Sequence, residues 1–144
     1  MAHFAQLNEN NEVVRVVVVD NDKVNMGGND VEELGVSHLQ SLYGSDTNWK
    51  QTSFNKSFRG NFAGVGHTYI ANAQTLGVGT TDIFICQKPY DSWSLGIQTA
   101  TWYSPHGAKP GITTTQYAEG RYWEWDEAAY QADNSTGWML RTYE

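Results

Sequence analysis

The sequence predicts a β-rich α+β fold: a small antiparallel sheet domain, one helix at about 29–43 and Trp-rich C-terminal hairpins. Three observations support this prediction: a β-branched run at 13–19, one stretch of helical periodicity, and aromatic segments paired across polar turns. β-Branched side chains lose little freedom when held extended, and they pack well on a pleated surface. At 144 residues the chain has the size of one domain with a single core.

Residues 1–21, MAHFAQLNENNEVVRVVVVDN, predict a β-hairpin. Phe4 and Leu7 lie in the first arm, and valines form most of the second. The turn at 8–11 reads Asn-Glu-Asn-Asn, and asparagine tolerates the left-handed backbone that tight hairpin turns require. We expect the valine strand to anchor the core.

The one convincing helix follows a glycine pair at 27–28. Asp30 can act as its N-cap, with Glu33 three residues later as in a capping box. Gly44 fits the C-terminal cap, whereas Gly35 weakens the helix. The residues that recur at helical spacing and predict its inner face are Val31, Leu34, His38, Leu39 and Leu42.

From residue 47 onward the pattern predicts strands and turns. Short strands are expected at 48–53, 68–70 and 82–87, with a loop at 71–79. Two hairpins follow, in which aromatic strands at 92–95 and 100–103, and then at 121–125 and 137–140, flank polar turns at 96–99 and 126–136. Cross-strand aromatic pairs stabilise such ribbons.

The segment 105–116 is rich in Pro, Gly and Thr and is the candidate joint between the two hairpins. We therefore predict a β-rich core domain with one helix over 1–104. Residues 105–144 are expected to form a Trp-rich hairpin extension, packed on the same domain or on a partner.

Charge and composition exclude several classes of partner. Lys and Arg total 9 against 16 Asp and Glu, so the net charge is -7. Such a chain is repelled by nucleic-acid phosphates and anionic lipid, and we expect neither nucleic acid nor membrane as a partner. Lys50, Lys56 and Arg59 form the only basic cluster, which we interpret as a solvated face. Residues 1–6 hold no Lys or Arg, so no signal peptide is expected.

No motif predicts catalysis, a metal or a cofactor. The four histidines are scattered, and the single cysteine, Cys86, has apolar neighbours that predict a buried, inert thiol. Gly60, Gly64 and Gly66 in RGNFAGVGHTY lack the following helix of a phosphate loop, and we interpret them as residues of tight β-turns. We expect a protein that is not an enzyme.

Two interpretations of the segment around Trp123 and Trp125 remain open. Alternation along a strand would direct both indoles inward and Glu124 and Asp126 to solvent. Alternatively, the tryptophans, with Trp138, could serve as stacking platforms for a sugar. A pair of carboxylates on one strand is weak evidence for glycoside hydrolysis, because such carboxylates usually face each other across a cleft.

Four segments carry a resemblance to known proteins: residues 1–21; SLYG at 41–44 with WKQTS at 49–53; SFRGNFAGVG at 57–66 running into Tyr69; and KPYDSW at 88–93 with Leu95 and Trp102. Together they resemble small virion structural (accessory) proteins of tailed bacteriophages, especially those of marine cyanobacteria. The first segment and FRGNFAGVG are the most specific. The resemblance covers about 1–105, and beyond it only the richness in tryptophan is similar.

The resemblance implies a non-enzymatic component of the virion, made in the host cytoplasm and present in multiple copies. We expect a capsid decoration or cement protein that binds the major capsid protein through aromatic β surfaces. A neck, tail or baseplate adaptor and a carbohydrate-binding module for host attachment are the alternatives. The candidate partner-binding residues are Trp93, Trp102, Tyr103, Tyr122, Trp123, Trp125 and Trp138.

Overall fold

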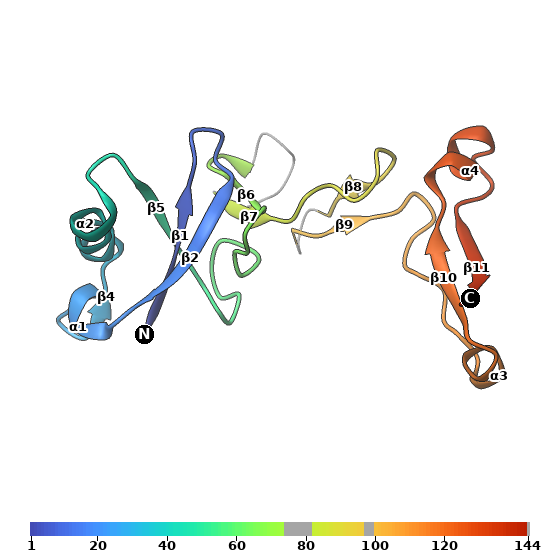
Figure 1. The fold of residues 1–144 in the computed structure, drawn as a ribbon, viewed down its shortest axis with the longest axis horizontal. Helices are drawn as coiled ribbons and strands as arrows, with labels where there is room; N and C mark the ends of the chain where they lie inside the picture. Colours follow the sequence, from blue (N-terminus) through green and yellow to red (C-terminus); the bar gives the residue numbers. More distant parts are fainter. Residues whose placement is uncertain (74–81, 97–99, 144) are drawn as a thin grey trace. The chain divides into compact units, whose positions relative to one another are not determined.

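The predicted β-rich α+β class is confirmed by the computed structural model, which describes residues 1–73, 82–96 and 100–143 (Figure 1). The described strands form several small antiparallel sheets. The chain divides into two units: unit 1 comprises Met1–Gln87 and Gly96–Thr101, and unit 2 comprises Lys88–Leu95 and Trp102–Glu144. That 105–144 acts as an extension of 1–104 stays a prediction.

Unit 1 is organised around a three-stranded antiparallel sheet in the order β2-β1-β5. Its elements are β1 (Ala2–Leu7), β2 (Val13–Val19), α1 (Asn21–Val24), β3 (Asn25–Met26), β4 (Asn29–Asp30), α2 (Glu32–Tyr43), β5 (Asn48–Thr52), β6 (Thr68–Ile70) and β7 (Ile83–Ile85). The N-terminal hairpin is confirmed, with Asn11 at a φ of 60° in its turn. The strands predicted near 48–53, 68–70 and 82–87 are also present, whereas 74–79 of the predicted loop lies outside the described residues.

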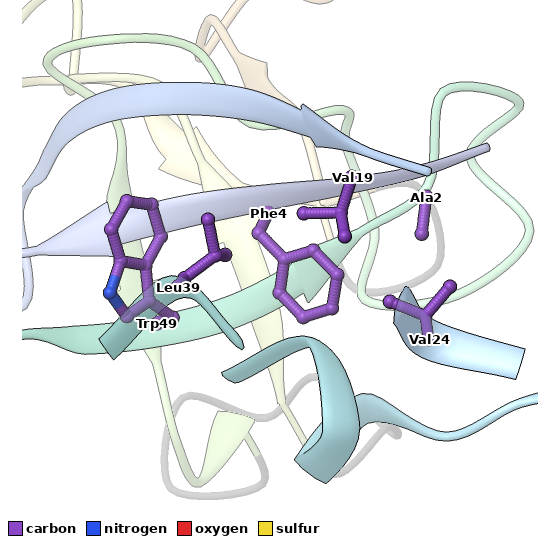
Figure 2. Packing of buried hydrophobic residues seen from close by; sticks show 6 residues of the cluster. All are labelled: Ala2, Phe4, Val19, Val24, Leu39 and Trp49. Carbon is purple, nitrogen blue, oxygen red and sulfur yellow. The ribbon is translucent and has the colours of Figure 1, made fainter. Parts of the chain in front are cut away.

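Both faces of the central strand β1 are buried. Successive side chains of a strand point in opposite directions, so alternate residues enter two different clusters. Phe4 belongs to a cluster beneath α2, and Ala5 belongs to a cluster on the other face. Figure 2 shows the first cluster, which contains Ala2, Phe4, Val19, Val24, Leu39 and Trp49. The second contains Ala5, Leu7, Val13, Ala63, Tyr69 and Phe84. Each large apolar side chain buried in this way contributes about 1.5–3 kcal/mol.

Helix α2 is present, but the prediction for its N-terminus is wrong. Asp30 pairs within the β3–β4 ribbon, and Val31 occupies the N-cap without a capping side chain. The C-terminal prediction is confirmed: Gly44 has a φ of 120°, and its N–H donates to the carbonyl of Gln40 over 2.9 Å. The carboxylate of Glu32 in the first turn does not cap the helix. It accepts hydrogen bonds from the Gln51 N–H and from the Arg59 guanidinium.

The inner face of α2 also differs from the predicted one. Leu39 is buried as expected and His38 is half-buried, but Leu42 is exposed. Gly35 is buried instead, and a Cβ at this position would overlap the ring of Phe4 and lie 2.7 Å from Val24 Cγ1. Glycine at position 35 therefore allows α2 to pack closely against Phe4 of β1 and Val24 of α1. This close packing places residue 35 on the inner face of the helix.

Unit 2 contains both predicted aromatic hairpins. Its elements are β8 (Ser94–Leu95), β9 (Trp102–Tyr103), α3 (Thr114–Ala118), β10 (Arg121–Trp125), α4 (Glu127–Ala132) and β11 (Trp138–Thr142). β8 pairs with β9, and β10 pairs with β11 so that Trp125 faces Trp138. Residues 97–99 of the first predicted turn lie outside the described residues, and the second turn contains α4.

The exposure of the single cysteine differs from the prediction. Cys86 is exposed, so the prediction of a buried thiol is wrong: β7 ends at Ile85, and the next side chain leaves the core. Across 1–73, 82–96 and 100–143, no helix is both long and apolar enough to cross a membrane.

Candidate functional site

All seven predicted partner-binding residues lie in unit 2, but they differ in accessibility. Trp125 is only 3% exposed, whereas Tyr103 is exposed. The remaining five, Trp93, Trp102, Tyr122, Trp123 and Trp138, are half-buried. Contact of any of them with a partner stays a prediction, and Trp125 has almost no surface to offer in the folded protein.

Three of these tryptophans form the centre of an aromatic cluster. Trp93 is edge-on to Trp125 and to Trp138, with ring centroids 5.9 Å apart in both pairs, and Trp125 and Trp138 are 5.4 Å apart. Tyr90 packs on Trp93, and Tyr130 packs on Trp125. Such pairs contribute about 0.5–1.5 kcal/mol each beyond burial. The cluster is therefore the core of unit 2.

Glu127 ties this core to the segment before β8. Its carboxylate accepts hydrogen bonds from the Ser92 hydroxyl (2.6 Å), the Ser92 N–H (3.1 Å), the indole N–H of Trp125 (2.9 Å) and the Gln131 amide (2.8 Å). These donors, the Ser92 hydroxyl first, lower the pKa of Glu127 to about 2. The charged carboxylate thus holds α4, β10 and residue 92 together.

Unit 2 is expected to lose stability in acid through Glu127. Because the folded pKa lies below the ordinary value of 4.5, the stabilisation is present above pH 4.5 and is lost as the pH falls toward 2. Tryptophan fluorescence during urea unfolding at pH 6, 4 and 3 follows this loss, since five of the six tryptophans lie in unit 2. Glu127→Gln should be less stable at pH 6 and should lose less on acidification.

The matched control is Glu119→Gln, which removes an exposed carboxylate from the same unit. It should keep the acid sensitivity of the native chain. Hydrogen bonds also lower the pKa of Asp126 and of Asp133, so Glu127→Gln should retain part of the pH dependence. An acid response in Glu127→Gln equal to that of the native chain would contradict the assignment.

A pocket of about 280 Å³ opens beside the aromatic core of unit 2. Its lining residues are Tyr90, Trp93, Lys109, Trp123, Glu124, Trp125 and Trp138. The indole N–H of Trp123 donates to the Gly111 carbonyl (3.1 Å), and that of Trp138 donates to the Gly107 carbonyl (3.3 Å). Both rings are therefore held in place by the backbone of 107–111.

The carboxylates beside these tryptophans are already engaged. Arg141 of β11 donates to Glu124 over 3.0 Å and to Asp126 over 2.7 Å. The expected alternation is confirmed for Trp125, which is buried, and for Glu124, which is exposed. One shared arginine leaves these two carboxylates poorly arranged as an acid and a nucleophile.

In unit 1, the guanidinium of Arg59 joins several segments of the chain. Its guanidinium binds both carboxylate oxygens of Glu32, donates to Asp82 Oδ2 over 2.8 Å and donates to the Gln51 carbonyl over 3.0 Å. Burial alone would lower its pKa, but the bonds to the two carboxylates outweigh burial and raise it. The prediction of a solvated basic face is thus wrong for Arg59.

The segment 57–66 is held in place by hydrogen bonds to β7 and to residue 100. Arg59 takes part through its backbone. Its own carbonyl accepts from the Phe84 N–H (2.9 Å), and the Asn61 amide donates to the carbonyls of Phe84 (3.0 Å) and Ala100 (2.8 Å). A Cβ at Gly60, where φ is 70°, would crowd Ile83 and Ala100 at 3.2–3.3 Å. The FRGNFAGVG segment therefore has a structural role in unit 1. This agrees with the interpretation of its glycines as turn residues.

An exposed apolar surface surrounds a groove of about 330 Å³ in unit 1. The large side chains Met1 (75% exposed), Phe54 (66%) and Phe58 (41%) line this groove. His3 stacks on Phe54 and meets Phe62 edge-on, with centroids 5.7 and 5.2 Å apart. We call this the Met1–Phe58 groove; the other lining residues are Ala2, His3, Asp30, Gln51, Thr52, Ser53 and Asn55. The sequence does not predict this groove because its residues come from separate segments.

Comparison with family models, with curated proteins and with solved structures finds no match to this chain. Within the described ranges, no group of three or more His, Cys, Asp or Glu side chains could hold a metal ion. The candidate sites are therefore the Met1–Phe58 groove of unit 1 and the aromatic pocket of unit 2.

Proposed function

We propose that the chain is a non-enzymatic structural protein of a tailed-phage particle, and specifically a capsid decoration protein that binds coat subunits. The Met1–Phe58 groove carries this proposal. Large apolar side chains that stay exposed in a folded domain are typical of protein contact surfaces. The residues that line it come largely from segments 1–21, 49–53 and 57–66, the ones that resemble phage virion proteins.

The mechanism is adhesive. Phe54 and Phe58 act as anchors that become buried against a coat subunit, surrounded by polar residues such as Gln51 and Asn55 at the rim. Full burial of one phenylalanine contributes about 1.5–3 kcal/mol, and many copies on one shell reinforce one another. A neck, tail or baseplate position uses the same contact with a different copy number.

Imaging of purified particles tests the proposal by locating and counting the chain. Hundreds of copies on the shell support a decoration protein, and six, twelve or a few multiples of these indicate the neck, tail or baseplate. Absence of the chain from intact particles contradicts the proposal.

The variant Phe54→Ser tests the contact surface itself. Because Phe54 is exposed, the variant should fold with little change in stability, yet its occupancy on the particle should fall about tenfold for each 1.4 kcal/mol of lost contact. Tyr117→Ser, which removes a 77% exposed aromatic residue of unit 2, is the matched control. Equal occupancy of both variants would place the contact elsewhere.

A further inference from the structure

The aromatic pocket of unit 2 has the properties of a small-ligand site distinct from the Met1–Phe58 groove. Its volume of about 280 Å³ lies just below the usual range for ligand pockets, about 300–1,000 Å³, and suits one small ring rather than a peptide. All its lining residues belong to unit 2, so the pocket is complete within that unit.

The walls of the pocket are fixed before any ligand arrives. The indole N–H groups of Trp123 and Trp138 are bound to backbone carbonyls, and that of Trp125 is bound to Glu127. Rings already held in one orientation lose little side-chain freedom on binding, and this lowers the cost of association. The faces of these rings are apolar and electron-rich, so they attract the C–H groups of a flat ring.

One tryptophan of the lining has a buried indole N–H without a partner among the described residues. The Nε1 atom of Trp93 is buried and makes no hydrogen bond with the described residues. Because this atom has no exposed surface, a ligand in the pocket does not reach it, and Trp93 contributes apolar ring surface to the lining.

The charge of the lining narrows the class of ligand. Lys109 contributes one cation and Glu124 one anion, and the anion is also bound by Arg141. Lys109 disfavours a quaternary ammonium ligand, which aromatic cages otherwise bind. The net charge of -7 and the Glu124 carboxylate in the lining disfavour an anion. A neutral ring with apolar faces and hydroxyl groups at its edge fits these conditions.

We propose that the aromatic pocket of unit 2 binds a neutral sugar ring in pyranose form. Its C–H face stacks on Trp123 and Trp138, and its hydroxyl groups accept from Lys109. The site does not depend on the role of unit 1, so it stands or falls separately from the capsid proposal.

Titration of the full-length ¹⁵N-labelled chain with neutral methyl glycosides tests this site. The probes are methyl glucoside, galactoside, mannoside and N-acetylglucosaminide at up to 50 mM, a concentration chosen for weak binding. The six tryptophan indole N–H signals are followed by NMR. Saturable shifts of the Trp93, Trp123 and Trp138 signals are expected with at least one glycoside, while Trp49 of unit 1 stays unchanged as the internal control.

Two variants and two other ligands make the outcome decisive. Trp123→Ala should weaken binding at least tenfold and Trp123→Phe much less, because phenylalanine keeps an aromatic face. The indole signals of Trp93 and Trp125 report whether either variant keeps its core. No saturable shift with any glycoside, equal shifts in Trp123→Ala, or a stronger response to choline or glucuronate would overturn the proposal.

Discussion

Replacing Trp125 with alanine should destabilise unit 2 by about 3–5 kcal/mol, the range for removing a large aromatic side chain from a core. Trp125 is 3% exposed and lies within 6.0 Å, centroid to centroid, of Trp93, Trp138, His106 and Tyr130. Its loss removes the ring that these groups share and leaves Glu127 without one of its donors. Urea unfolding followed by near-ultraviolet circular dichroism measures the change.

Tyr117→Ala is the control for Trp125→Ala. Tyr117 is a largely exposed aromatic residue of the same unit, and its removal should change the free energy of unfolding by about 0.5 kcal/mol or less. A folded Trp125→Ala variant of native stability that binds particles poorly would show instead that Trp125 is a contact residue. The buried position of the ring leads us to expect the opposite.

Replacing Arg59 with methionine should destabilise unit 1 by about 3 kcal/mol, near the lower end of the cost of breaking a buried ion pair. The lower end applies because Arg59, Glu32 and Asp82 keep 19–28% of their side-chain surface. Methionine keeps much of the apolar stem but leaves two carboxylates without their cation. Thermal unfolding of the full chain measures the loss.

Lys56→Met is a closely matched control for Arg59→Met. Lys56 lies in the same segment, carries the same charge and has a φ of 58° against 55° for Arg59, but its side chain is exposed. It should change stability by about 0.5 kcal/mol or less. Arg59→Lys should fall between the two, because an ammonium keeps the charge without the paired donors that bind Glu32. Equal effects of Arg59→Met and Lys56→Met would contradict a structural role for the guanidinium.

Several elements could be predicted because their causes are local. The turn at 8–11 and the valines after it specify the β1–β2 hairpin, and the aromatic segments 121–125 and 137–140 specify the β10–β11 hairpin. The short helices α3 and α4 were missed although each has a signal. Thr113 and Gln116 form a capping box, and Asp126 caps the N–H of Ala129.

The functional surfaces were harder to predict because their residues are distant in sequence. Arg59 binds Glu32, which lies 27 residues earlier in the sequence, and Asp82, which lies 23 residues later. A charge pattern cannot reveal pairs at such separations. The Met1–Phe58 groove likewise joins the N-terminus to residues after β5. In unit 2, the sequence predicted aromatic hairpins but could not separate core tryptophans from pocket walls.

The sequence by itself determined the strands other than β3 and β4, the type of the one long helix and the aromatic character of the C-terminal hairpins. These features follow from turn chemistry and side-chain period, which act over a few residues. Only the tertiary structure decided that Gly35 lies on the inner face of α2, that Arg59 binds two carboxylates inside unit 1, and that Trp125 belongs to the core of unit 2. Each of these depends on packing between segments that only the folded chain brings together, because close packing leaves no freedom for a side chain that does not fit.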